Sequence, residues 1–351
     1  MNKKFVSVMC CAVMAVGMLA GCGGGDSSGN AEGGSAKLGL ITGTGGLGDE
    51  NMNDAAYEGL CELEDDGVEV DVVEPEESSD FENLQTLFAD TGEYEAIFCI
   101  TYENTDALTK VSADFPDQRF VLVDSEVDAD NVTNVLFRSE ETGFQLGVLA
   151  GLLEKENALP NLNDEQRVGF VGGQDSPTIN QFAAGYRAGV LLVNPEAMVD
   201  ISYVGSFSDP STATEITNGL YENGCDIVFA CAGGSGLGVF TSAERMNGYA
   251  FGIEVNQNEN APDNIIASGM RLWDRVMTEI GSEAVAGELE GGTRTFGLAE
   301  DALEIGYEGS NVEVSEEVKE ETESYMEKVV SGEYQLPTTL EEVDAFLQEA
   351  Q

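Results

Sequence analysis

A glycine-rich turn holds the first residues whose types and spacing could do chemistry. Gly43-Thr44-Gly45-Gly46-Leu47-Gly48 satisfies the pattern G-x-G-x-x-G between a strand-like and a helix-like run, and Glu69, Asp71 and Glu74 follow where a ribose-binding acid would lie. One interpretation is a dinucleotide-dependent oxidoreductase. The other is a strand-to-helix turn that offers backbone N–H groups to a polar solute. Because the chain has 42 glycines, chance matches are expected, and we favour the second interpretation.

The absence of histidine excludes several kinds of catalysis. The chain has no histidine, which removes Ser-His-Asp and Cys-His catalysis and all histidine-based metal sites. No serine or cysteine has a visible activating base, and the carboxylates show no EF-hand spacing. We therefore expect a protein that is not an enzyme and that needs no cofactor or metal. The cysteines Cys61, Cys99, Cys225 and Cys231 show no CxxC spacing, and their pairing is left open.

The first residues indicate the compartment. Lys3 and Lys4 precede an apolar run at 5–19 that is too short to span a bilayer as a helix, and it ends in Leu19-Ala20-Gly21-Cys22. This ending resembles the bacterial lipobox, although an ordinary secretory signal with a chance cysteine is the alternative. We expect a signal peptide at 1–21, lipidation of Cys22, and a flexible Gly/Ser tether at 22–35. The protein would then be anchored at the extracytoplasmic face of the cell membrane.

The charge of the chain excludes one class of partner. It carries 66 acidic against 15 basic residues, a net charge of −51 at pH 7. Such a surface repels phosphate backbones, so we expect no nucleic-acid partner. The same charge keeps the surface strongly solvated.

Strand-like and helix-like segments alternate along the chain, which predicts parallel sheets with helices on both faces, in two copies. Ligands of such sheets bind beyond the carboxyl ends of the strands, here just after Thr42, Thr101, Val204 and Ala232. The expected strands are 37–42, 68–73, 96–101, 120–123, 132–137, 167–172, 201–204 and 227–232. The expected helices are 51–64, 81–89, 105–115, 142–154, 179–193, 212–223, 315–330 and 341–350.

Several blocks resemble one family of lipoproteins. Gly45-Gly46-Leu47-Gly48-Asp49-Glu50-Asn51-Met52-Asn53, continuing to Tyr57-Glu58-Gly59-Leu60, resembles the opening "TDxGGxxDxSFNQxxxxGL" of the basic membrane protein family. Segments 138–150, 168–186 and 226–238 resemble further blocks of that family, in the same order. Its members are substrate-binding lipoproteins, and characterised ones bind purine nucleosides.

The resemblance implies a type I periplasmic-binding-protein fold, an α/β architecture of two doubly wound parallel-sheet lobes joined by a hinge. We expect an N-terminal lobe at 36–140, with 257–305 returning to it. The C-terminal lobe would span 141–256 and 306–335, followed by a tail at 336–351. The resemblance also implies delivery of a small-molecule solute, a nucleoside or another hydroxylated solute, to the permease of an ABC importer. A ligand-sensing receptor of the same fold is the alternative.

Ligand contacts follow from the resemblance residue by residue. The family's "GvDxDQ" corresponds to Gly252-Ile253-Glu254-Val255-Asn256-Gln257, and the lysine of its "sxxK" block corresponds to Arg271. The resemblance implies that Glu254 and Arg271 hold the ribose hydroxyls, since a carboxylate accepts hydrogen bonds and a cation donates them. The family blocks also place Asp49, Asn53, Gly233 and Gly234 at the ligand.

The side expected to bind the base departs from the family pattern. Gly43 replaces the family's acid, and Met52 replaces its stacking phenylalanine, although a methionine can cover a ring face through its sulfur. Phe229 is our candidate for the opposite face of the base, with Phe207 and Tyr102 as alternatives. Asp106 either accepts from an exocyclic amine or supports the start of a helix.

Overall fold

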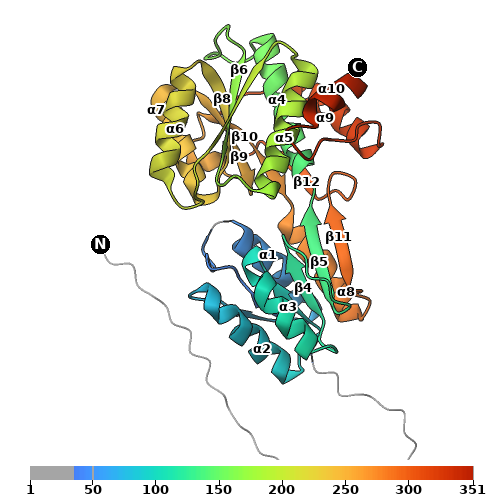
Figure 1. Cartoon of the computed structure of the whole chain (residues 1–351). Helices are drawn as coiled ribbons and strands as arrows, with labels where there is room; N and C mark the ends of the chain where they lie inside the picture. Colours follow the sequence, from blue (N-terminus) through green and yellow to red (C-terminus); the bar gives the residue numbers. More distant parts are fainter. Residues whose placement is uncertain (1–34, 50, 351) are drawn as a thin grey trace, which may run out of the picture. The chain divides into compact units, whose positions relative to one another are not determined.

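The computed structural model describes residues 35–49 and 51–350, which form two sheets with helices on both faces of each (Figure 1). Both sheets belong to one compact unit. The expected signal peptide, the Cys22 anchor and nearly all of the tether lie outside the described residues. No helix within the described ranges combines the length and apolar character that a membrane crossing requires.

The first sheet is entirely parallel, with the strand order β11-β5-β4-β3-β1-β2. Its strands are β1 (Lys37–Ile41), β2 (Glu69–Val73), β3 (Ala96–Cys99), β4 (Phe120–Val123), β5 (Val132–Phe137) and β11 (Gly292–Phe296). Leu40 and Phe98 pack on one face against α1 (Met52–Cys61) and α8 (Trp273–Ala286). Ile97 and Phe120 pack on the other face against α2 (Phe81–Thr91) and α3 (Thr105–Asp114). Alternate side chains are thus buried on opposite faces, as a doubly covered parallel sheet requires.

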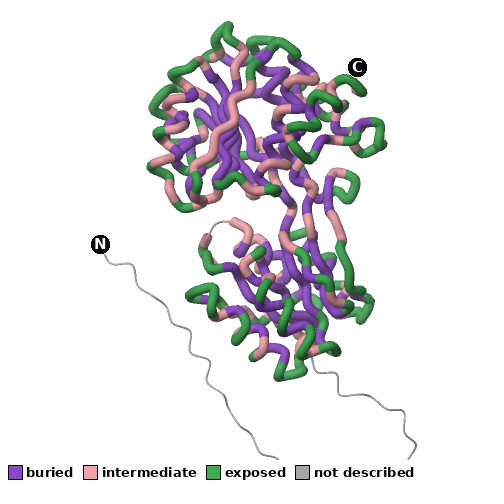
Figure 2. The backbone as a smooth tube through the Cα atoms, in the orientation of Figure 1, coloured by how far each residue is buried: buried purple, intermediate pink, exposed green. Residues whose placement is uncertain are grey.

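The second sheet repeats this arrangement in the order β12-β10-β9-β8-β6-β7, and only its edge strand β12 is antiparallel to its neighbour. Its strands are β6 (Arg167–Gly172), β7 (Met198–Tyr203), β8 (Cys225–Cys231), β9 (Tyr249–Glu254), β10 (Ile265–Arg271) and β12 (Leu303–Gly306). One face packs against α4 (Ser139–Glu156), α5 (Pro177–Val193), α9 (Glu316–Val330) and α10 (Val343–Glu349). The other face packs against α6 (Pro210–Glu222) and α7 (Leu237–Met246). The central strands β6, β8, β9 and β10 are mostly buried between the helix layers, whereas the edge strand β7 is partly exposed (Figure 2).

The predicted fold class is confirmed: each sheet is parallel or nearly so, is covered on both faces, and has the same order in its five principal strands. The expected lobe boundaries differ from the sheets in two places. We expected 257–305 to return to the first lobe, but β10 and β12 pair in the second sheet, so only α8 and β11 return. The expected tail contains α10, whose Val343 and Phe346 are buried in the core of the second lobe.

Helices α4 and α5 approach closely because glycines lie between them. A Cβ atom on Gly143 would collide with the carbonyl of Phe182, and one on Gly185 with the carbonyl of Glu140. Figure 1 shows the two helices side by side on one face of the second sheet. Near the end of α4, Glu154 has only 2% of its surface exposed and no hydrogen-bond partner for either carboxylate oxygen.

The cysteines in the described part of the chain are unpaired. Cys61 is partly buried, whereas Cys99, Cys225 and Cys231 are buried as free thiols. Burial raises the pKa of Cys225 to about 12, with Asp200 adding to the effect. These thiols are therefore protonated at neutral pH and pack as small apolar groups.

Candidate functional site

The glycine-rich turn at the carboxyl end of β1 directs its backbone donors toward side chains of the protein. Its N–H groups donate to three carboxylates and one amide oxygen: Gly43 to Asn53 Oδ1 (2.8 Å), Thr44 to Glu103 Oε2 (3.0 Å), Leu47 to Glu74 Oε2 (2.8 Å) and Gly48 to Asp54 Oδ1 (2.7 Å). A diphosphate would have to displace these acceptors while approaching their negative charge. The dinucleotide-binding interpretation is therefore not supported, and the segment is a braced strand-to-helix turn.

Two of the expected ligand contacts, Asp49 and Asn53, brace the start of α1. Asp49 accepts from the backbone N–H groups of Asn51 (2.9 Å), Asn53 (3.2 Å) and Asp54 (3.2 Å), and from Asn53 Nδ2 (2.8 Å). Asn53 is only 4% exposed, and its amide oxygen is the acceptor for Gly43. These bonds fix the N-terminal end of the helix and hold Asp49 at the edge of a cavity.

A cavity of about 720 Å³ is lined by residues from both lobes. It brings together Asp49, Gly233 and Gly234, all expected at the ligand. The first lobe contributes Asp49 and Asn51; the second contributes Gly233, Gly234, Leu237, Asn256, Gln257, Glu259, Asn260, Glu308 and Gly309. Because amides both donate and accept hydrogen bonds, this wall suits a ligand with hydroxyl or amide groups.

The amide wall of the second lobe is held in place by hydrogen bonds. Asn256 Nδ2 donates to the carbonyl of Glu308 at 3.0 Å. Gln257 Oε1 accepts from the N–H of Ile253 at 3.0 Å, and the Gln257 N–H donates to Ser268 Oγ at 3.0 Å. The segment after β9 is therefore tied to β10 and to the loop after β12, which makes this wall preorganised.

The turn after β8 forms another part of the same wall. Gly233 has a φ of 55°, in the left-handed region that favours glycine, and a Cβ atom on Gly234 would lie 3.2 Å from the carbonyl oxygen of Phe207. Ser235 Oγ donates to the carbonyl of Ser206 at 2.9 Å and accepts from the N–H of Asp209 at 2.8 Å. The turn is thus packed directly under the loop that follows β7.

Arg271 forms a buried polar centre that joins the two lobes. It ends β10 of the second sheet, is 3% exposed, and donates from Nη1 to both oxygens of Asp124, which follows β4 of the first sheet, at 3.1 Å. Its Nη2 donates to Ser139 Oγ at 2.9 Å, and its Nε lies 3.5 Å from Glu254 Oε2. The backbones of Asp124 (φ 59°) and Glu254 (φ 71°) are both left-handed, a strained conformation that the surrounding contacts must maintain.

Aromatic rings enclose the Arg271 guanidinium. Its central carbon lies 5.2 Å from the ring centroid of Phe137, 4.9 Å from that of Phe182 and 5.7 Å from that of Trp273. Trp273 Nε1 also donates to Glu254 Oε2 at 3.2 Å. We expected Glu254 and Arg271 to face each other across the ligand, but the two side chains are in direct ionic contact. Burial raises the pKa of Glu254, and the neighbouring Arg271 opposes that shift.

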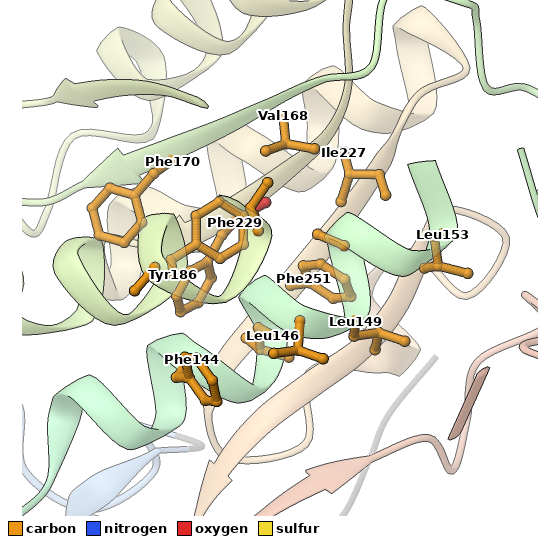
Figure 3. Packing of buried hydrophobic residues seen from close by; sticks show 14 of the residues in the cluster. Phe144, Leu146, Leu149, Leu153, Val168, Phe170, Tyr186, Ile227, Phe229 and Phe251 are labelled. Carbon is orange, nitrogen blue, oxygen red and sulfur yellow. The ribbon is translucent and has the colours of Figure 1, made fainter. Parts of the chain in front are cut away.

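Phe229 does not form a ligand wall, contrary to expectation. It is fully buried, and its ring centroid lies 5.3 Å from that of Phe170 and 5.4 Å from that of Tyr186. Figure 3 shows the three rings packed together. Phe229 lies within β8, and its side chain is on the face of the sheet that α5 covers.

The remaining expected contacts lie away from the lining of the cavity. Met52 is partly buried against the core of the first lobe, and Asp106 is exposed in the first turn of α3. Sequence reasoning missed much of the lining, namely Asn51, Asn256, Gln257, Glu259, Asn260 and Glu308. A polar run directly after the apolar 249–254 segment is the signal that could have found most of it, by the same strand-end rule.

Comparison with known proteins places these features in a family. Residues 37–339 match the family Bmp, described as "ABC transporter substrate-binding protein PnrA-like". The "CD4+ T-cell-stimulating antigen" of Listeria monocytogenes is 31% identical over 325 residues, spanning 85% of this chain and 87% of the relative. The "ABC transporter nucleoside-binding protein BmpA" of Lactococcus lactis subsp. cremoris is 29% identical over 346 residues, spanning 91% of this chain and 95% of the relative.

A solved structure supports the same fold. The crystal structure of an ABC transporter solute-binding protein from Aeropyrum pernix K1 has a TM-score of 0.77 and 23% sequence identity to this chain. It covers 90% of this chain and 99% of its own. At this identity the likeness shows the fold alone.

Proposed function

This chain belongs to the Bmp family of ABC transporter substrate-binding proteins, and from that premise we propose that it captures a nucleoside and delivers it to the permease of an ABC importer. The observation that carries the proposal is the cavity of about 720 Å³, whose lining comes from both lobes. Its volume falls within the range of small-molecule sites. The name of the Lactococcus relative supports a nucleoside as the solute.

The lining fits a hydroxylated solute better than an apolar one. The amides of Asn51, Asn256, Gln257 and Asn260 can pair with sugar hydroxyls and with the edge of a base, and Leu237 offers an apolar surface beside them. In this proposal the solute is bound and released unchanged, as the two lobes close around it and reopen. The lipobox-like sequence at Cys22 supports anchoring of the receptor to the membrane that holds its importer.

Two measurements test this function. Mass spectrometry of small molecules released by denaturing the purified protein should identify the solute that it carries. A panel of nucleosides, nucleobases and pentoses should then raise the melting temperature with increasing concentration, because a ligand at 100 times its Kd stabilises the folded state by about 2.7 kcal/mol. Consumption of the bound compound by pure protein would favour an enzyme instead.

A matched pair of variants locates the site. Gly234→Leu adds a large side chain at a position in the lining of the cavity, close to the carbonyl oxygen of Phe207, and should abolish the ligand-dependent rise in melting temperature while the variant still unfolds cooperatively. Gly219→Leu, on α6 where a Cβ atom meets nothing within 4 Å, is the control and should leave that rise unchanged. If the ligand raises the melting temperature of both variants equally, the ligand binds outside this cavity.

A further inference from the structure

The charged residues around the cavity indicate which charge the solute can carry. This inference rests on the proposed function and extends it. We propose that the cavity is a charge filter, which rejects phosphorylated solutes and favours those with a protonated amine, and that Glu259 and Glu308 determine this specificity. Both glutamates line the cavity. Neither carboxylate has a hydrogen bond or an ion pair to any described residue.

The lining of the cavity offers no cation to an anionic ligand. Its ionisable side chains are Asp49, Glu259 and Glu308, and none of the described lining residues is lysine or arginine. Asp49 already accepts several hydrogen bonds from the start of α1, which leaves the two glutamates as carboxylates open to a ligand. A phosphate entering this space would meet negative charge from both lobes.

The buried cation between the lobes is already neutralised. Arg271 contacts two carboxylates, Asp124 and Glu254, and its remaining terminal nitrogen donates to Ser139. With one positive charge against two negative ones, this centre adds to the negative potential between the lobes. It therefore cannot hold a phosphate unless an existing ion pair breaks.

The glycine-rich turn at 43–48 supplies no anion site either. A glycine-rich turn before a helix is ordinarily a site where N–H groups bind phosphate. In the turn at 43–48, however, Thr44, Leu47 and Gly48 give their N–H groups to the carboxylates of Glu103, Glu74 and Asp54. The usual positive end of such a motif is thus replaced by carboxylates, which would repel the same ligand.

These features let the cavity distinguish solutes of similar shape by their charge. A carboxylate attracts a protonated amine and repels a phosphate over the same distance, so the two derivatives of one solute should change affinity in opposite directions. We expect a 5′-monophosphate to bind at least about 100-fold more weakly than its nucleoside, and a 5′-amino-5′-deoxy analogue to bind about 10-fold more tightly.

The test compares charge variants of one scaffold by titration calorimetry on the full-length protein. The ligands are adenosine, its 5′-monophosphate and its 5′-amino-5′-deoxy analogue, with ribose, ribose 5-phosphate and an amino-deoxyribose as a second scaffold. In the double variant Glu259→Gln/Glu308→Gln, the ratio of the Kd of the phosphorylated ligand to the Kd of the amino ligand should fall by at least about tenfold. The control Glu288→Gln/Glu290→Gln removes the same charge from an exposed loop of the first lobe and should leave this ratio of Kd values unchanged.

Each outcome decides between the two proposals. The charge filter is overturned if a monophosphate binds as tightly as its nucleoside. It is also overturned if the control variant lowers the ratio of Kd values as much as the cavity variant does. Neither result affects the proposed function. Binding of the pentose series without the nucleosides overturns the nucleoside assignment, while the filter is still tested on the pentoses. If no ligand of either scaffold binds, both the proposed function and the charge filter are overturned.

Discussion

Replacing Glu154 by glutamine should stabilise this protein at neutral pH. Both carboxylate oxygens of Glu154 are buried without a hydrogen-bond partner. Burial, with a smaller contribution from Asp226, raises the pKa of Glu154 from 4.5 to about 8. The folded protein therefore keeps a proton that the unfolded chain releases above pH 4.5.

The sign and size of the effect follow from proton linkage. Because the folded-state pKa is raised, the full stability is present below about pH 4.5 and is lost as the pH rises toward 8. The loss is about 1.4 kcal/mol per pH unit, or about 3 kcal/mol between pH 4.5 and 7. Glu154→Gln removes this proton uptake while keeping the shape of the side chain. The variant should match the parent at pH 4 and exceed its stability by about 3 kcal/mol at pH 7.

Urea unfolding followed by far-ultraviolet circular dichroism, at pH steps from 4 to 8, measures this difference. Tryptophan fluorescence alone is insufficient, because the single tryptophan, Trp273, packs in the first lobe and Glu154 lies in the second. Glu156→Gln, an exposed position on the same helix, is the control and should show no pH-dependent gain. A gain for Glu154→Gln that is the same at pH 4 and pH 7 would refute the reasoning.

Four further changes test other features. Cys22→Ser should move the protein from the membrane fraction to the soluble one, and unchanged retention with intact export would contradict the anchor. Phe229→Ala should cost about 3–5 kcal/mol in urea unfolding and leave the solute Kd of the folded protein unchanged, whereas a weakened Kd without loss of stability would return Phe229 to the ligand site. Arg271→Met should cost about 3–5 kcal/mol because it leaves two partly buried carboxylates without their cation, and Arg271→Lys should cost less; equal losses would exclude an ionic role. Gly185→Ala should lower stability by about 1–3 kcal/mol by forcing α4 away from α5, and an unchanged unfolding midpoint would show that the contact can relax.

The periodic part of the fold could be predicted from local sequence. The strands Phe120–Val123, Val132–Phe137 and Arg167–Gly172 have the bounds that were predicted, because parallel strands covered on both faces are rich in apolar residues. The assignment of β10 to the second sheet could not be predicted in this way. It depends on which strand β10 pairs with, and its apolar run looks the same in either sheet.

The site was harder to predict because its partners are distant in sequence. The acid that holds Thr44 is Glu103, 59 residues away, and the one that holds Arg271 is Asp124, 147 residues away. Family resemblance gave Arg271 a role toward a ligand, and only the folded chain shows that its donors face the protein's own side chains. Phe229 was misplaced for a simpler reason: its position within the strand was known, but the sequence does not show that its side chain is on the face of the sheet that α5 covers.

The late position of β11 and α8 in the chain sets an order on biosynthesis. A chain made from its N-terminus produces β1 to β5 first, yet Trp273, Met277 and Ile280 of α8 complete the core beneath them, and β11 pairs with β5 only once residue 296 has emerged. All the parallel strands of the second lobe are made in the interval. The first lobe therefore remains incomplete, with an apolar face of its sheet uncovered, while the strands of the second lobe are synthesised. Chaperone protection would then be needed longest by the half of the protein that leaves the ribosome first.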